Sequence, residues 1–393
     1  MSRPTSARPG SGERGAEPGR RPGSLTRGYA SASPLARRVR AAGGVAVALL
    51  LAGSGGLEAR RASLGHDASL RRNVGQTIMT GVAGATPSAD LLERVRGGEV
   101  GGVILFGENI RSPAAVATHV RKLQQVASAG GNPPLLVAVD QEGGQVRRLP
   151  DGPPSASAAR LGQTLDAAGV AAEGRRTGAY LHRLGLSVDL APVADVADAR
   201  TSFLGSRVFG NDPDLVARLA PAFAGGLQRA HVGATAKHFP GLGTAPANTD
   251  VARVVVRTRR GELERRLRPF RAAAASGVKV VMVSNASYPA LDPTGAPALF
   301  SRPIVGNLLR GRLGFGGVVI TDALGAPAPR ATAHAPARAL AAGVDVLLYT
   351  SEAESRAGFA DLLASARSSA AVRSHLAAAD ARIAALKAWL AHG

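Results

Sequence analysis

The sequence predicts an α/β protein built as a (β/α)8 barrel, and three observations support this prediction. Eight short, continuous apolar runs recur from about residue 70 onward. Each run is followed by a polar or glycine-rich loop and then by a helical stretch rich in Ala, Leu and Arg. The chain has 393 residues, which is enough for one such barrel of about 250 residues together with extensions.

The eight runs are expected to be parallel strands, because strands covered by helices on both faces are apolar throughout. They are Gln76–Val82, Gly102–Phe106, Leu135–Val139, Leu186–Ala191, Gly233–His238, Val278–Ser284, Gly317–Thr321 and Val344–Tyr349. An open, doubly wound sheet is the alternative arrangement of the same alternation. No Gly-x-Gly-x-x-Gly follows the first run, so no dinucleotide cofactor is expected.

The two ends of the chain differ in character. Residues 1–40 are basic and rich in Pro, Gly and Ser, which predicts a disordered leader. Residues 41–54 are apolar, follow several arginines and are too short for a transmembrane helix of about 20 residues, which is typical of a secretory signal. A buried hydrophobic helix is the alternative for this segment. Residues 70–393 remain for one folded domain, and the helical spacing within 372–390 predicts a last helix that packs on the outside of the barrel through Ile383, Leu386, Trp389 and Leu390.

The absence of cysteine from the sequence excludes several chemistries. Disulfide scaffolds, thiolate zinc sites, iron–sulfur clusters and cysteine nucleophiles all need that residue. Leu51-Ala52-Gly53-Ser54 resembles a bacterial lipoprotein signal, but Ser54 stands where the lipid-bearing Cys belongs. We therefore expect an exported protein, extracellular or associated with the cell envelope, that is not lipidated.

The net charge of +20 does not by itself indicate a nucleic-acid partner. Residues 1–54 hold nine Arg against Glu13 and Glu17, and the remaining basic residues are scattered. No basic patch is interleaved with aromatic residues. We expect no nucleic-acid partner, and nothing in the sequence implies a stable protein partner.

Polar side chains gather where the predicted strands end, and parallel barrels carry their active sites at that rim. The residues are Asp140-Gln141-Glu142-Gly143-Gly144 with Arg147 and Arg148, then Asp195 with Arg207, Lys237-His238 with Asn248-Thr249-Asp250, Ser284-Asn285, and Thr321-Asp322. Each one alone could cap a helix or form an ion pair, but their coincidence on one rim predicts a site. Carboxylates with cationic donors suit a neutral polyhydroxyl ligand, and two carboxylates flanking a pocket suffice for glycoside hydrolysis. No phosphate-binding loop and no metal-ligand spacing of histidines is present, so neither a cofactor nor a metal is expected.

Six ordered motifs make the interpretation specific. They are Gly101-Gly102-Val103-Ile104-Leu105-Phe106-Gly107, the 140–144 block with Arg148, Ala191-Pro192-Val193-Ala194-Asp195-Val196, Arg207-Val208-Phe209-Gly210, Lys237-His238-Phe239-Pro240-Gly241 and Val318-Val319-Ile320-Thr321-Asp322. Over roughly residues 70–350 the chain resembles glycoside hydrolase family 3, in its single-domain β-N-acetylglucosaminidase (β-hexosaminidase) branch.

The resemblance implies a role for each matching residue. Asp322 matches the nucleophile, which would form a covalent glycosyl-enzyme and retain the configuration at the anomeric carbon. The residues that match those holding the non-reducing-end sugar are Asp140, Arg148, Arg207, Lys237 and His238. The expected activity is exo-acting removal of terminal β-linked N-acetylglucosamine from cell-wall-type oligosaccharides.

The loop after the fifth strand departs from the family pattern. This branch carries His-Gly, four residues and then Asp-Ser-His, of which the last His is the general acid/base and the Asp orients it. Here Leu242 replaces the first His, Asn248 the Asp, and Asp250 the acid/base His. Two carboxylates at these positions would repel one another, whereas the Asn248 amide removes that repulsion and can hydrogen-bond Asp250. We expect Asp250 to act as the acid/base, with Asn248 as its partner.

Two further positions complete the expected site. Asn285 stands where many relatives carry His, and we place it with the substrate-binding residues, in an orienting or structural role. His334, on the loop after Asp322, is an outside candidate for the acid. The alternatives to the expected function are a family 3 β-glucosidase-type hydrolase, or a catalytically impaired wall-sugar-binding protein in which the acid/base has been lost.

Overall fold

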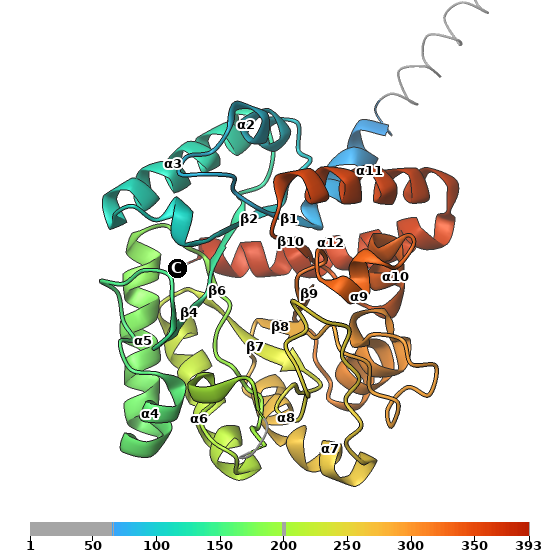
Figure 1. The fold of residues 1–393 in the computed structure, drawn as a ribbon. Coiled ribbons are helices and arrows are strands. Elements are labelled where there is room, and N and C mark those ends of the chain that lie inside the picture. The colour runs from blue at the N-terminus through green and yellow to red at the C-terminus, as the bar shows by residue number, and fades with distance from the viewer. Residues whose placement is uncertain (1–64, 66, 199–201, 393) are drawn as a thin grey trace, which may run out of the picture. The chain divides into compact units, whose positions relative to one another are not determined.

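Eight parallel strands form one sheet that curves into a nearly closed barrel (Figure 1). The computed structural model describes residue 65, residues 67–198 and residues 202–392, all of which belong to one compact unit of the chain. The predicted leader and the predicted signal-like segment, 1–40 and 41–54, lie outside the described residues. No helix among the described residues is long and apolar enough to cross a membrane.

Seven strands of the barrel fall within a predicted run, and the eighth, β7, starts with its run and ends just after it. The strands are β1 (Ile78–Gly81), β2 (Gly102–Leu105), β3 (Leu136–Val139), β6 (Val188–Asp189), β7 (Gly233–Phe239), β8 (Val280–Val283), β9 (Val318–Thr321) and β10 (Leu347–Tyr349), β7 extending one residue beyond its run. They are hydrogen-bonded in the order β10-β1-β2-β3-β6-β7-β8-β9. A parallel bridge between Ile320 and Val346 joins β9 to β10. This ring confirms the barrel and excludes the open sheet.

Helices surround the ring and alternate with its strands (Figure 1). They are α2 (Ala89–Arg96), α3 (Pro113–Ala129), α4 (Ala158–Thr164), α5 (Ala167–Arg183), α6 (Pro213–Arg229), α7 (Arg260–Arg266), α8 (Arg268–Ala275), α9 (Pro327–Arg330), α10 (Ala335–Ala342), α11 (Glu352–Ser368) and α12 (Ala370–Ala391). Short 3-10 turns occupy 107–109, 205–207 and 298–300, and a π-helix spans Pro303–Arg312. Several helices begin at a Ser or Asp whose side chain accepts a backbone N–H of the first turn, as Ser112 does for α3.

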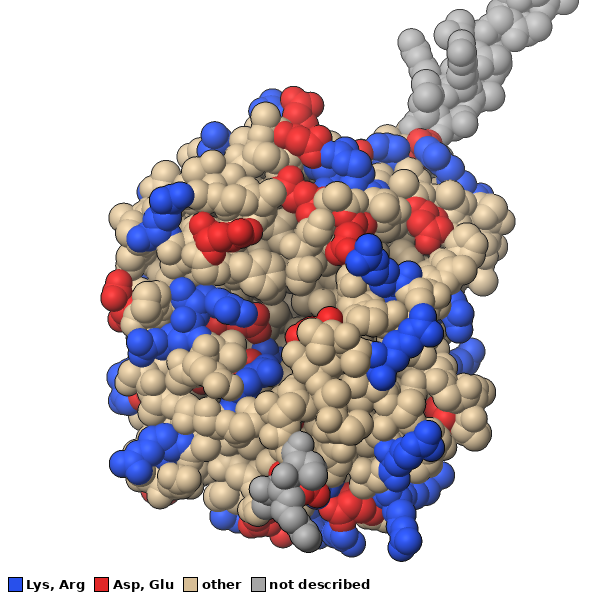
Figure 2. All heavy atoms as spheres, viewed as in Figure 1, with Lys and Arg blue, Asp and Glu red and all other residues tan. Residues whose placement is uncertain are grey.

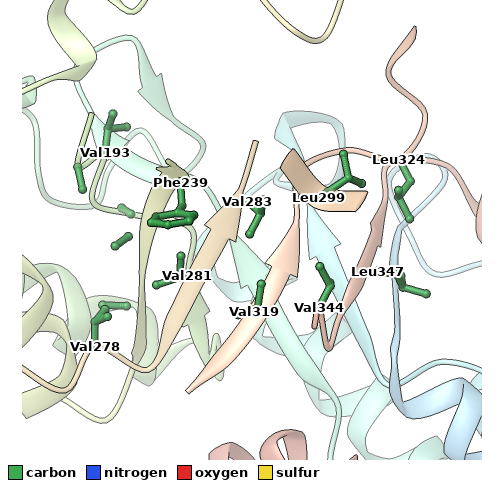
Figure 3. Packing of buried hydrophobic residues seen from close by; sticks show 14 of the residues in the cluster. Val193, Phe239, Val278, Val281, Val283, Leu299, Val319, Leu324, Val344 and Leu347 are labelled. Carbon is green, nitrogen blue, oxygen red and sulfur yellow. The ribbon is translucent and has the colours of Figure 1, made fainter. Parts of the chain in front are cut away.

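The strands divide their side chains between two hydrophobic layers, since successive residues of a strand point to opposite faces. In β8, Val280 and Met282 lie in the cluster that fills the barrel. Val281 and Val283 lie in the larger cluster between strands and helices, which Figure 3 shows in part. Both faces are apolar, which explains why the runs read as continuous.

The last helix does not pack only on the outside of the barrel, as the sequence suggested. Leu376 and Ala379 of α12 join the outer cluster, but Ile383 and Leu386 belong to the cluster inside the barrel, with Trp389 packed against it. The helix therefore crosses the amino ends of the strands and closes that end of the ring. The prediction of outside packing was wrong because helical spacing identifies an apolar face without saying what the face covers.

A two-stranded antiparallel ribbon interrupts the alternation after β3. It consists of β4 (Gln141–Gly143) and β5 (Val146–Arg147). The buried side chain of Gln141 holds the following loop through its amide, which donates to the carbonyl groups of Leu149 and Pro153, both at 3.0 Å. This ribbon keeps the acidic block and Arg148 at the rim of the barrel.

Candidate active site

One cavity of about 370 Å³ opens at the carboxyl ends of the strands. Figure 2 shows it as a hollow in the face of the molecule, with acidic and basic side chains at its edge. Eight of the nine predicted site residues line it, namely Asp140, Arg148, Arg207, Lys237, His238, Asn248, Asp250 and Asp322. Its volume is in the range of small-molecule sites.

Lys237 connects two carboxylates at one side of the cavity. Its Nζ lies 2.6 Å from Asp140 Oδ1 and 2.7 Å from Glu142 Oε1. Burial alone would lower the pKa of this lysine, but the charges of Asp140 and Glu142 raise it above its usual value. Lys237 is thus a fixed cation at neutral pH, suited to donate a hydrogen bond to a hydroxyl oxygen.

Arg207 is held by Glu142 through two parallel hydrogen bonds. Its Nε donates to Oε2 and one terminal nitrogen to Oε1, each at 2.8 Å. Burial raises the pKa of Glu142, but the charge of Lys237 and the bonds from Arg207 outweigh that effect and lower it to about 2. Bidentate pairing fixes the plane of the guanidinium group, so the remaining N–H groups have a defined direction.

Asp195 positions His238. Its Oδ2 lies 2.7 Å from His238 Nδ1 and also accepts the His238 backbone N–H at 3.1 Å. Its Oδ1 accepts the backbone N–H of Leu242 at 2.7 Å. A proton on Nδ1, shared with a fully buried carboxylate, leaves Nε2 as the ring atom available to a ligand.

Arg148 reaches the cavity from the β4–β5 ribbon. Its guanidinium carbon lies 5.9 Å from the centre of the Phe106 ring, which also lines the cavity. Its buried Nε has no hydrogen-bond partner among the described residues. A buried donor without a partner is costly, so a ligand oxygen here would be bound favourably.

Asp322 follows β9 and has one oxygen engaged. Oδ1 accepts the N–H of Ala323 at 2.8 Å, and the Asp322 N–H donates to the Val283 carbonyl at 2.9 Å. Among the described residues, no hydrogen bond is made to Oδ2. Burial raises the pKa of Asp322, the charge of His238 lowers it and the charge of Asp250 raises it further. The carboxylate is thus held in place with one oxygen exposed to the cavity.

Asp250 and Asn248 lie together, although not through the contact expected from the sequence. The Asn248 side-chain oxygen accepts the backbone N–H of Asp250 at 3.0 Å, and no bond joins the two side chains. Asn248 therefore shapes the turn that presents Asp250. The Asp250 carboxyl is exposed at the cavity mouth, close enough for its charge to act on Asp322.

Asn285 is the one predicted site residue that does not line the cavity. It is 1% exposed, and its amide nitrogen donates to the Ala323 carbonyl at 2.9 Å. It holds the backbone next to Asp322. His334 is also outside the cavity: its ring pairs with Asp361 at 2.8 Å and is largely exposed.

Three acidic residues near the site had no role assigned from the sequence, since Glu142 and Asp195 were expected only as rim residues and Glu354 was not singled out. Glu142 and Asp195 lie behind Arg207, Lys237 and His238, and Glu354 lines the cavity. The signal for Glu142 was its place two residues after Asp140, since side chains two residues apart in an extended segment share a face. Among the described residues, no group of three or more His, Cys, Asp or Glu could hold a metal ion.

Comparisons with known proteins agree on one family. Residues 69–386 match the family model described as the glycosyl hydrolase family 3 N-terminal domain. An uncharacterized secreted glycosyl hydrolase of Arthroderma benhamiae is 37% identical over 284 residues, covering 70% of this chain and 80% of that protein. A β-hexosaminidase of Nitrosomonas eutropha is 35% identical over 292 residues, covering 71% and 81%.

Solved structures give the same result. A family 3 β-N-acetylglucosaminidase from Paenibacillus sp. FPU-7 superposes with a TM-score of 0.78 at 36% identity, covering 82% of this chain. This chain spans only 62% of the length of that protein. A β-N-acetylhexosaminidase from Beutenbergia cavernae superposes with a TM-score of 0.75 at 34% identity, covering 81% of this chain and 98% of that one.

Proposed function

The chain belongs to glycosyl hydrolase family 3, and from this we propose that it is an exo-acting, retaining β-N-acetylhexosaminidase. It removes terminal β-linked N-acetylglucosamine from cell-wall-type oligosaccharides. The observation that carries the proposal is that Asp322 and Asp250 line one small cavity together with the residues matched to sugar binding. The names of the similar hexosaminidases and N-acetylglucosaminidases support the choice of sugar.

The non-reducing-end sugar lies against the charged side of the cavity. Asp140 accepts hydrogen bonds from ring hydroxyl groups, while Lys237 and Arg207 donate to hydroxyl oxygens. Arg148 and His238 complete the set. Glu142 pairs with Arg207 and Lys237, and Asp195 pairs with His238. The orientation of these donors is fixed before the sugar binds, which reduces the entropy lost on binding.

Asp322 is the nucleophile. Its free Oδ2 attacks the anomeric carbon as the bond to the leaving oxygen breaks, and a glycosyl ester forms. The hydrogen bond from Ala323 to Oδ1 fixes the carboxylate plane for this attack. The leaving oxygen takes the proton from the Asp250 carboxyl, so no unstable alkoxide is released.

Asp250 then acts in the opposite direction. Its carboxylate removes a proton from water, whose oxygen attacks the same carbon and frees Asp322. The sugar departs with the configuration it had in the substrate. An exposed carboxyl group at the cavity mouth is accessible to both the leaving group and the incoming water.

Export of the protein is part of the proposal. The similar protein from Arthroderma benhamiae is described as secreted, and the apolar segment at 41–54 has the character of a signal. Ser54 in place of Cys means that lipid is not attached there.

A panel of chromogenic β-glycosides tests the proposed activity. Turnover of the N-acetylglucosaminide supports it. Turnover of the glucoside alone would assign a β-glucosidase-type enzyme, and sugar binding with no turnover would assign a wall-sugar-binding protein that has lost its acid/base.

A further inference from the structure

We propose that Glu354 is a specificity-determining residue that selects substrates with a neutral leaving group over substrates whose leaving group carries a carboxylate. The inference rests on the proposed function and defines the substrate class of the same site. It starts from the finding that Glu354 lines the cavity together with Asp322 and Asp250.

The Glu354 carboxylate lies against the loop that carries the nucleophile. A Cβ added to Gly325 would stand 2.5 Å from Oε2 and 3.1 Å from Oε1. Gly325 is three residues after Asp322 and also lines the cavity. The absence of a side chain at Gly325 is what lets the carboxylate occupy this place.

The Glu354 carboxylate has no donor in the part of the chain that the structure describes. Among the described residues, neither a hydrogen bond nor an ion pair is made to the Glu354 oxygens. The neighbouring Glu352, by contrast, accepts the Ala83 N–H at 2.8 Å and the Ser88 hydroxyl at 3.0 Å. Glu352 is therefore tied into the fold, and Glu354 is free to interact with a ligand.

The order of the strands puts Glu354 on the leaving-group side. The sugar-binding residues lie at or after the carboxyl ends of β3, β6 and β7. Glu354 follows β10, which stands opposite β6 in the ring and next to β9. The sugar is held by its hydroxyl groups on the β3–β7 side of the cavity, with its anomeric carbon at Asp322. Its scissile bond therefore points away from the β3–β7 side. The leaving group then extends towards the β10 part of the rim.

The charge states during the first step make Glu354 decisive. Asp250 is protonated when the leaving group departs, and Asp322 neutralises its charge by forming the ester. Of the remaining carboxylates that line the cavity, Asp140 is paired with Lys237, which leaves Glu354 to act on the leaving group. It accepts hydrogen bonds from neutral hydroxyl or amide groups, but a carboxylate beside it is repelled.

The test uses two substrates that differ in one charge. They are the 3-carboxyphenyl and 3-carbamoylphenyl β-glycosides of the sugar that the wild type hydrolyses, and kcat/KM is measured for each. The selectivity ratio is kcat/KM for the carbamoyl substrate divided by kcat/KM for the carboxyl substrate. We expect this ratio to fall about tenfold in Glu354→Gln, mainly through a lower KM for the carboxyl substrate, because one like charge is lost. Comparing ratios cancels the difference in intrinsic reactivity of the two phenols. In the wild type, higher salt lowers this ratio, because it screens the repulsion between Glu354 and the substrate carboxylate.

Gly325→Ala provides a second variant that keeps the charge and moves it. The new methyl group displaces the flexible Glu354 carboxylate. The carbamoyl-to-carboxyl ratio of kcat/KM therefore changes when Gly325→Ala is made in the protein that retains Glu354. In a Glu354→Ala background the same substitution leaves the ratio unchanged, which is the coupling expected of a contacting pair. Glu93→Gln, an exposed residue of α2 outside the cavity, is the matched control and keeps the wild-type ratio.

The result that overturns the inference is a ratio in Glu354→Gln within twofold of the wild type. Because the wild type would still hydrolyse both substrates, and Asp322→Asn neither, that result leaves the proposed function standing. A wild type that hydrolyses no glycoside of the panel overturns both.

Discussion

The Asn248 side-chain oxygen accepts the backbone N–H of Asp250 at 3.0 Å and makes no bond to the Asp250 carboxyl. Asn248 thus fixes where Asp250 stands and leaves its protonation to the surroundings. An acid/base needs this freedom, because it must carry a proton in one half of the reaction and lose it in the other. In the proposed mechanism, the single Asp250 carboxyl group takes over the acid/base role for which the family pattern has an Asp–His pair.

Asp322→Asn is expected to abolish turnover while the protein stays folded. Turnover is lost because the amide cannot form the glycosyl ester. The fold is retained because Asp322 has no ion-pair partner among the described residues, so the substitution breaks no ion pair. Steady-state rates on the aryl N-acetylglucosaminide and a thermal unfolding curve measure the two effects. Near wild-type rates in the folded variant would remove Asp322 from the nucleophile role.

Asp250→Ala is expected to slow a natural disaccharide about 10²-fold more than an activated aryl glycoside, in line with typical general-acid contributions. A phenolate of low pKa leaves without a proton, whereas a sugar alkoxide does not. Azide should partly restore the second step, since the carboxylate that repels anions is gone. For the same reason the wild type should favour hydrolysis over phosphorolysis.

Equal losses on both substrate types, with no rescue by azide, would make Asp250 a structural residue. His334 would be the next residue to replace, although its exposed pairing with Asp361 makes it a poor candidate. His334→Ala therefore serves as the control in this series and should keep the wild-type pattern.

The acid limb of the pH profile should move to lower pH in Asp250→Asn. Burial raises the pKa of Asp322, and the negative charge of Asp250 raises it further. As the proposed nucleophile, Asp322 attacks only when ionised, so activity should be lost as pH falls through its pKa. Removing the charge of Asp250 lowers that pKa. The measurement is kcat/KM against pH on the activated aryl glycoside, and an unmoved acid limb would contradict the prediction.

Asp189 should make the protein less stable as pH rises from about 4 to about 8. Burial raises its pKa to about 8, so the folded state keeps a proton that the unfolded chain releases near the usual value of about 4. The free energy of unfolding then falls by as much as about 1.4 kcal/mol per pH unit in this window. Urea unfolding at pH 5 and pH 7.5 should show this fall in the wild type and a smaller one in Asp189→Asn. An equal fall in the free energy of unfolding in the wild type and in Asp189→Asn would mean that Asp189 is ionised in the folded protein.

Mass spectrometry of the protein from its native host should find no diacylglyceryl adduct. The sequence contains no Cys to carry one, and Ser54 has no thiol. A lipid-modified peptide from residues 41–60 would overturn this prediction.

The strands were predictable because each is apolar on both faces, and the rim residues were predictable because strand ends meet on one side of a barrel. The residues that the sequence did not single out act through partners far along the chain. Glu142 was expected only as one of the rim residues, and its role was missed because its contacts with Arg207 and Lys237 join three separate strand ends. Ser351-Glu352-Ala353-Glu354 has the spacing of a helix capping box, which assigns Glu354 to the helix end, whereas its carboxylate lies in the cavity.

The pairing of β1 with β10 has a consequence for how the protein is made. Ile78 finds its partner in Leu347, and the last helix supplies Ile383 and Leu386 to the interior of the ring. Closure must therefore wait until β10 and α12 have left the ribosome, and a ring that depends on such distant contacts forms slowly. Until then β1 has β2 beside it but lacks its other neighbour, so the barrel is incomplete along that edge.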